Sequence, residues 1–289
     1  MPETSDDKAF PAPHEGSDEQ LAGTIRSLHE RIDELHRLVA ARVEAEGGYA
    51  GELLHLRGGA GRPRPALPAW RRSTQGELRI PVALATAVAI ALQVAVPDRL
   101  VLVTPSWIFP TVQGVLLIAL VASNPQRIDR ESSFLRWLSL ALAAALSLAN
   151  GWSVVRLAIG ITRGTTGQNA GQLLLTGAVI WVINVIVFGL WYWEFDRGGP
   201  AARARASGSR FPDFQFPQMA LPSEIVPPDW EPNFVDYLYL AFTNATAFSP
   251  TDVMPMSRWA KVAMTVQSAI SLVTAALVIS RAVNIFPSG

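Results

Sequence analysis

The chain of 289 residues contains no cysteine and only four histidines. The missing thiols exclude disulfides, thiolate metal sites and cysteine nucleophiles, and so few histidines predict no metal site and no cofactor. Charge is also scarce, at 17% of residues, and 24 basic side chains balance 24 acidic ones. Without net positive charge we expect no nucleic-acid partner. No nucleophile elbow, phosphate-binding loop or His/Glu metal motif occurs, so the sequence does not predict an enzyme.

Apolar residues make up 49% of the chain and are concentrated in blocks. Four blocks lie at roughly 80–97, 106–123, 134–160 and 171–193, and a fifth lies at about 260–285. Each approaches the ~20 residues that a helix needs to cross a ~30 Å hydrocarbon layer. The sequence therefore predicts an all-α integral-membrane protein with about five transmembrane helices, and the lipid bilayer is its first expected partner.

Composition divides the chain into six predicted segments. We expect a disordered tail at 1–18, a coiled-coil or amphipathic helix at 19–46, a Gly/Pro/Arg linker at 47–79, four transmembrane helices at 80–193, an irregular loop at 194–232, and a pore-like helix-loop with the last transmembrane helix at 233–287. Three arginines lie between the second and third blocks and four follow the fourth, whereas the loops at 98–105 and 162–170 hold one each. Arginine marks cytoplasmic loops, so we expect a cytoplasmic N-terminus and a bacterial inner (cytoplasmic) membrane.

The N-terminal helix carries apolar residues at alternating steps of four and three. These residues are Leu21, Ile25, Leu28, Ile32, Leu35 and Val39. Such spacing is the seam of a coiled coil, and it predicts assembly with a second helix. A single amphipathic helix lying on the protein or on the membrane surface is the alternative.

The segment from Asn233 to Pro255 is too polar for a typical span, yet it lies between two apolar blocks. Its aromatic first half predicts a short helix that ends near Thr246, with Thr243 and Asn244 at the polar tip. Irregular backbone at membrane depth is tolerated only where it is buried in protein or lines water. The pattern therefore predicts a re-entrant helix-loop.

From Thr246 through Asp252 to Pro255 the chain resembles the pore-loop cation channels, the superfamily of the potassium channels. Their order of pore helix, threonine-led filter, aspartate, two residues, proline and inner helix fits here without a gap, and the resemblance covers about residues 171–287. It implies a homo-oligomer around a pathway for monovalent cations. The phrases around Asp236 and Arg281 also resemble an uncharacterised family of bacterial integral-membrane proteins.

The filter itself departs from the potassium-channel pattern, because Ser249 and Thr251 replace both glycines and Pro250 replaces the aromatic residue. Only glycine adopts left-handed backbone cheaply, so a stacked ring of carbonyls is not expected. A pore here would be lined by hydroxyls and amides and be poorly selective. The same residues also match a helix start with Ser249 as N-cap and Asp252 at the third helical position.

The orientation of the loop stays open. Potassium-channel loops enter from outside, whereas the arginine distribution places the entrance of this loop in the cytoplasm. Either the loop is inverted, or residues 234–250 cross the membrane as a further helix, or one earlier block does not span it.

Polar residues in the last apolar block share one helix face. Gln267, Ser271 and Thr274 are separated by four and three residues, so they either join helices by hydrogen bonds or line a water path. The complete set of candidate pore-lining residues is Thr243, Asn244, Thr246, Ser249, Thr251, Asp252, Gln267, Ser271 and Thr274. The sequence thus favours an oligomeric cation pore. The alternative is a non-conducting membrane scaffold or sensor that recruits a partner through the N-terminal helix.

Overall fold

The computed structural model describes residues 24, 27–35, 37–38, 67–123, 127–128, 132–166, 169–208, 211–222, 224–246 and 252–285. The chain divides into two units after residue 66. In the first unit, residues 27–35 and 37–38 are helical, and the side chains of Leu28, Ile32 and Leu35 are exposed. The tail predicted at 1–18, the rest of the linker up to residue 66, and the seam residues Leu21, Ile25 and Val39 lie outside the described residues.

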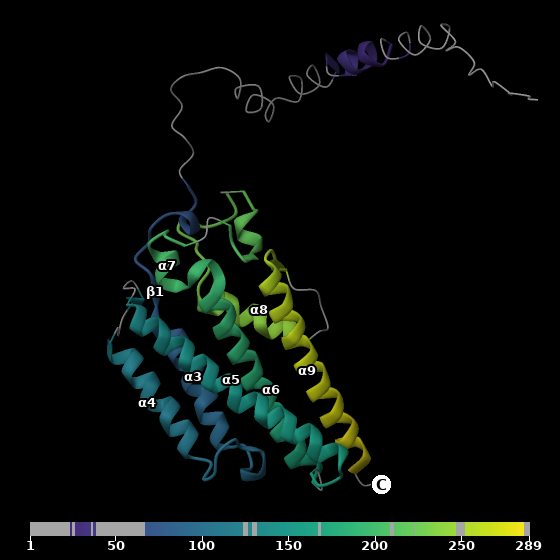
Figure 1. Ribbon diagram of the computed structural model, residues 1–289. Helices are drawn as coiled ribbons and strands as arrows, with labels where there is room; N and C mark the ends of the chain where they lie inside the picture. Colours follow the sequence, from purple (N-terminus) through teal and green to yellow (C-terminus); the bar gives the residue numbers. More distant parts are fainter. Residues whose placement is uncertain are drawn as a thin grey trace, which may run out of the picture. The chain divides into compact units, whose positions relative to one another are not determined.

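Five long helices dominate the second unit (Figure 1). They are α3 (Arg79–Val94), α4 (Ile108–Ser123), α5 (Ser133–Thr162), α6 (Ala170–Phe195) and α9 (Arg258–Ile285), one for each apolar block. In the described part of the chain, three stretches are long and apolar enough to cross a membrane, at 30, 29 and 28 residues: Ser133–Thr162, Ala170–Gly198 and Arg258–Ile285. The predicted helical membrane protein is thereby confirmed in outline, but α3 and α4 have only 16 residues each.

Short elements gather at the end of the bundle where α6 finishes. They are η2 (Ala69–Arg71), β1 (Glu77–Leu78), β2 (Arg127–Ile128), η4 (Asp196–Gly198), α7 (Pro200–Ala204), β3 (Phe214–Gln215), η5 (Pro217–Met219), α8 (Phe234–Thr246) and β4 (Met254–Pro255), while η3 (Asp98–Leu100) joins α3 to α4. Strand β1 pairs with β2 and β3 with β4, both antiparallel. The segment at 194–232, predicted to be irregular, therefore contains four short elements.

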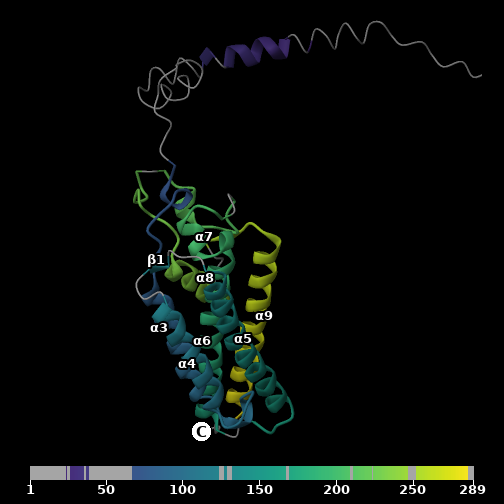
Figure 2. The same cartoon turned by 60° about the vertical axis from the view of Figure 1, so that its left-hand side comes forward.

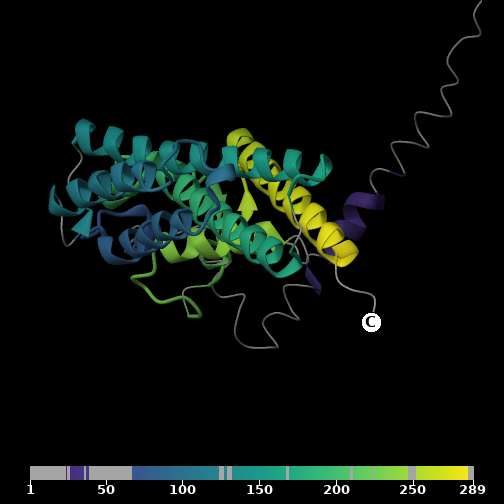
Figure 3. The same ribbon diagram turned by 90° about the horizontal axis from the view of Figure 1, so that it is seen from below.

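Helix α6 is the centre of the unit. Its sequence is apolar on every side, which is typical of a helix surrounded by others. It packs against α3, α5, α8 and α9, with α3 and α4 to one side of it and α9 to the other (Figures 2 and 3). Two glycines allow the closest approaches: a Cβ at Gly177 would lie 2.7 Å from Val278 on α9, and a Cβ at Gly189 would lie 3.3 Å from the Leu238 backbone on α8.

Large apolar side chains point outward from every long helix. They include Leu84 on α3, Val115 and Ile118 on α4, Leu148 and Val155 on α5, Leu175 on α6, and Val262, Leu272 and Val283 on α9, all exposed. Soluble monomers rarely expose contiguous apolar surface on this scale, whereas a hydrocarbon layer covers it without cost. The outer surface of the bundle is thus suited to lipid.

Candidate functional site

Helix α8 is half the length of its neighbour α6 and runs antiparallel to the second half of it. At its start, the Phe234 ring lies 5.8 Å from the Trp193 ring, close to the end of α6. About two turns later, Phe242 lies 5.8 Å from Trp181, near the middle of α6. With 13 residues, α8 is about 20 Å long, so it ends roughly halfway along the bundle.

The chain after α8 is fixed again at the end of α6. Strand β4 pairs with β3, and Met256 donates its backbone N–H to the Asp213 carbonyl at 2.7 Å. The Asp213 carboxylate accepts a hydrogen bond from Trp259 Nε1 at 2.8 Å, while the Asp213 N–H donates to Asp196 at 2.8 Å. The start of α8 and the start of α9 therefore lie at the same end of the bundle (Figure 1).

Gln267 is the centre of a buried hydrogen-bond network that joins α6, α8 and α9. Its Oε1 accepts from the Tyr192 hydroxyl at 2.6 Å and from Asn244 Nδ2 at 2.8 Å, and its Nε2 donates to the Ala241 carbonyl at 2.8 Å. Ser268 donates to both the carbonyl and the side chain of Asn244 at 3.1 Å. Each such bond between membrane helices is worth about 0.6–2 kcal/mol, so the network fixes α8 between its neighbours.

The polar face expected on the last helix is present, and it is directed into the protomer. Gln267, Ser271 and Thr274 are 0%, 1% and 5% exposed. Asn184 on α6 donates to the Ser271 hydroxyl at 3.0 Å. Gln267, Ser271 and Asn244 thus join helices of one chain, whereas the buried Thr274 hydroxyl has no hydrogen-bond partner.

The other candidates lie at the tip of α8 and beyond. Thr243 and Thr246 are half-buried in its last turn, and their hydroxyls donate to carbonyls one turn back. Asp252 is exposed, whereas Ser249 and Thr251 lie outside the described residues. In the described residues, Asp252 lies in a bend and the next helix, α9, begins at Arg258, whereas the helix start expected at Ser249 lies outside them.

Asn244 also borders an open hollow of about 540 Å³ between the tip of α8 and α9. Among the described residues its walls include Pro255, Lys261, Thr265 and Ser268. The last turn of α8 contains no basic residue. Because the carbonyl end of a helix carries about half a negative charge, the tip of α8 is an electronegative point halfway along the bundle.

A second polar cluster, which the sequence did not predict, holds the start of α8. The Glu77 carboxylate accepts hydrogen bonds from Arg203 at 2.7 Å, from Trp193 Nε1 at 2.7 Å and from the Phe234 backbone N–H at 3.1 Å. Glu77 and Arg203 form a buried ion pair. The first orphan N–H of α8 is thus satisfied by a carboxylate on β1.

Asn233 and Asp236 cap the same helix. The Asn233 side chain accepts from the Val235 N–H at 3.0 Å, and Asp236 accepts from the Asn233 N–H at 2.8 Å. This reciprocal arrangement is a capping box with an asparagine and an aspartate. Carboxylates near the helix start also complement its positive end.

Arg203 is the positive centre of this cluster. It donates to the Trp193 and Asp196 carbonyls at 2.8 and 2.9 Å, and its guanidinium lies 5.1 Å from the Tyr237 ring, while the Tyr237 hydroxyl donates to the Asp196 carboxylate at 2.6 Å. Burial alone lowers the pKa of Arg203, but Tyr237, Glu77 and Asp196 outweigh it and raise the pKa above its ordinary value. Arg203 therefore stays charged at every accessible pH.

Neither region offers a metal site, since the described part of the chain contains no group of three or more His, Asp or Glu side chains placed to hold an ion. The arrangement instead consists of a half-length helix that is anchored by charge at its start and by amides along its side. No protein-family model matches the sequence, and comparison with curated proteins and with solved structures finds no similar chain.

Proposed function

We propose that the protein is one subunit of a homo-oligomeric, poorly selective cation pore, in which α6, α8, residues 247–257 and α9 form the conducting part. The observation that carries this proposal is the half-length helix α8, whose start and whose following strand β4 both lie at the end of α6. A helix that enters a membrane and ends halfway brings its last carbonyls to a depth where only protein or water can satisfy them.

The charge of that helix end favours cations. Helix C-termini placed at mid-membrane coordinate monovalent cations in transporters, and a ring of carbonyls does so in channels. Several copies of α8 around an axis would sum their negative ends. Thr243 and Thr246 are the hydroxyls that would then face the ion, whereas Asn244, Gln267, Ser271 and Thr274 support the helices from behind.

One protomer leaves room for such assembly. On α8 itself, Val235, Tyr239 and Phe242 are exposed, and the hollow beside Asn244 is open. A single chain does not enclose a conduit with these surfaces, so neighbouring subunits would complete it. In this arrangement α3 and α4, at about 24 Å each, cross most of the ~30 Å layer and bring the number of spans to five.

The absence of cysteine makes a direct test simple. Purified protein in liposomes is assayed for K⁺ and Na⁺ flux, and Thr246→Cys is then treated with a charged thiol reagent. We expect flux from the wild type and a large loss of flux in the labelled variant. Thr111→Cys, on the exposed side of α4, is the matched control and should conduct normally after labelling. No flux from the wild type, or equal flux before and after labelling at 246, would refute the pore.

A non-conducting scaffold is the second candidate, and one observation favours it. Leu28, Ile32 and Leu35 lie on the described helix of the first unit at 52%, 47% and 60% exposure. Such a seam is stable in water only when a second helix covers it. If removal of residues 1–46 abolishes a partner interaction while the intact protein conducts no ions, the scaffold is the correct function.

A further inference from the structure

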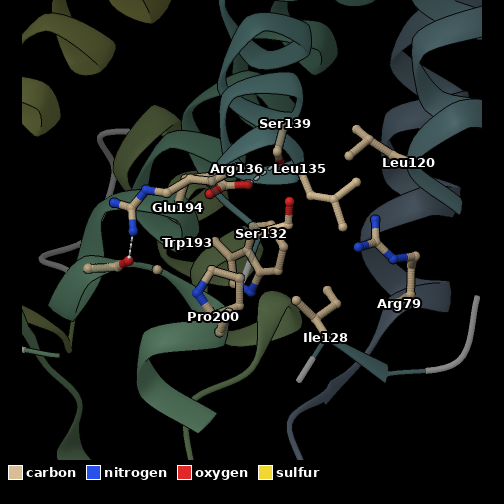
Figure 4. Close-up of a pocket in the computed structure, with 13 residues that line it drawn as sticks. Arg79, Leu120, Ile128, Ser132, Leu135, Arg136, Ser139, Trp193, Glu194 and Pro200 are labelled. Carbon is tan, nitrogen blue, oxygen red and sulfur yellow. Dashed lines mark hydrogen bonds between the residues drawn. The ribbon is translucent and has the colours of Figure 1, made fainter. Parts of the chain in front are cut away.

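A small cavity lies at the same end of the bundle, apart from α8 and α9. It has a volume of about 50 Å³ and is lined by residues of α3, α4, β2, α5, the end of α6 and α7. Figure 4 shows the polar side chains around it: Arg79, Ser132, Arg136, Ser139 and Glu194. At ~12 Å³ for each water, the space holds about four waters, which is the size of one phosphate group.

Arg79 is the unusual residue of this cavity. Its side chain is nine-tenths buried, at 9% exposure, and its Nε lacks any hydrogen-bond partner. In Figure 4 its guanidinium is directed into the cavity, opposite Glu194. A buried cation is costly unless it is paired and hydrogen-bonded, so an arginine in this state needs a further acceptor.

The remaining groups of the cavity leave it positive. Glu194 accepts a hydrogen bond from the Ser139 hydroxyl, and Arg136 donates to the Gly198 carbonyl. Among the described residues, two arginines and one glutamate therefore line the cavity. Ser132, which lines the cavity at the N-cap of α5, makes no side-chain capping bond, so its hydroxyl does not satisfy the first N–H groups of that helix. Together these donors match an anion with several oxygens.

The surroundings identify the source of that anion. An adjoining cavity of about 30 Å³ continues from Arg79 and Glu194 between apolar side chains such as Val82, Leu117 and Leu142. On α5, whose Leu135 and Arg136 line the cavity, the neighbouring Phe134 and Trp137 are 69% and 72% exposed. Exposed aromatics at a helix end mark the headgroup level of a bilayer.

We propose that this cavity binds the phosphate of an anionic phospholipid, with Arg79 as the principal donor and the apolar extension receiving the start of an acyl chain. Basic pockets between helices on the cytoplasmic side are the usual place for such lipids. The lipid site is separate from the proposed pore, so the test of lipid binding does not depend on whether the protein conducts ions.

The test compares thermal unfolding in a neutral detergent with added phosphatidylglycerol, phosphatidylcholine or inorganic phosphate. We expect phosphatidylglycerol alone to raise the Tm of the wild type, by on the order of 5–10 °C at ~100 Kd. Arg79→Gln should lose this rise, Arg79→Lys should keep a reduced one, and Arg258→Gln, an exposed arginine at the start of α9, should respond like the wild type.

Three results would overturn the proposal. An equal rise in Tm with phosphatidylcholine would show that the protein does not recognise the anionic headgroup. An equal rise in Tm with inorganic phosphate would assign the cavity to free phosphate. An unchanged response in Arg79→Gln would place the lipid elsewhere. If Arg79→Gln does not fold, the comparison of the three additions on the wild type and on Arg79→Lys still decides.

Discussion

The ion pair between Glu77 and Arg203 offers the sharpest test of how α8 is held. Glu77→Gln keeps an oxygen that accepts from Trp193 and from the Phe234 N–H, but it removes the negative charge beside Arg203. The two side chains are only 7% and 4% exposed, so water cannot replace the lost partner. The variant isolates the cost of leaving one buried cation without its carboxylate.

The magnitude follows from that burial. Removing one member of a buried pair costs about 3–5 kcal/mol. For a unit of this size, 1 kcal/mol corresponds to roughly 2–4 °C, so we expect Glu77→Gln to lower the Tm by about 6–20 °C. Because Glu77 also fixes the first N–H of α8, ion flux should fall as well. Replacing both partners, as Glu77→Gln with Arg203→Met, should cost less than Glu77→Gln alone.

The assay is thermal unfolding of purified protein in detergent, followed by tryptophan fluorescence. Glu224→Gln serves as the matched control, because Glu224 is an exposed glutamate in the loop before α8. A Tm for Glu77→Gln within about 2 °C of the control, or strictly additive effects in the double variant, would refute the account of the anchor.

Two further predictions concern packing and pH. Gly177→Ala should destabilise the protein by about 1–3 kcal/mol, because its methyl would lie 2.7 Å from Val278. Gly151→Ala should be neutral or stabilising, because no atom lies within 4 Å of the added methyl. The Tm values of the two variants check this difference. Burial raises the pKa of Glu231, although a hydrogen bond from Thr74 lowers it in part. The folded state therefore binds this proton more readily than the unfolded state, so the gain in stability is complete below the unfolded pKa of ~4.3 and is lost as pH rises through the folded pKa. Melting curves from pH 4 to 7 should show a smaller low-pH gain in Glu231→Gln, and identical pH profiles would contradict the assignment.

Hydropathy alone located the long helices, because burial in lipid or in a bundle demands a continuous apolar run. The end of the short helix at Thr246 could also be predicted, since aromatic residues give way there to small polar ones. Hydropathy could not predict whether each helix is long enough to cross the membrane. The apolar blocks of α3 and α4 include residues that form turns beyond the helices, so within the described residues three helices have the length of a full span.

The sequence could not predict which helix the polar face of α9 contacts, nor the charged cluster around Glu77 and Arg203, because both depend on contacts between residues far apart in the chain. Spacing shows that Gln267, Ser271 and Thr274 share a face of α9, but it does not show which helix that face meets. Glu77 and Arg203 are 126 residues apart. In the sequence, Arg203 counted only as one of the positive loop charges that set orientation, and nothing local to Glu77 marked it as a partner.

The two ends of α8 are treated differently by the fold, and this difference connects structure to function. At its start the donors are satisfied within the protomer, by Glu77 and by the Asn233–Asp236 box. Along its side Gln267 and Asn244 fix its depth. A chain that commits this many buried polar contacts to a half-length helix holds the negative end of that helix at one chosen depth. In the pore proposed above, a helix end held at one depth is what a site for a passing cation would require.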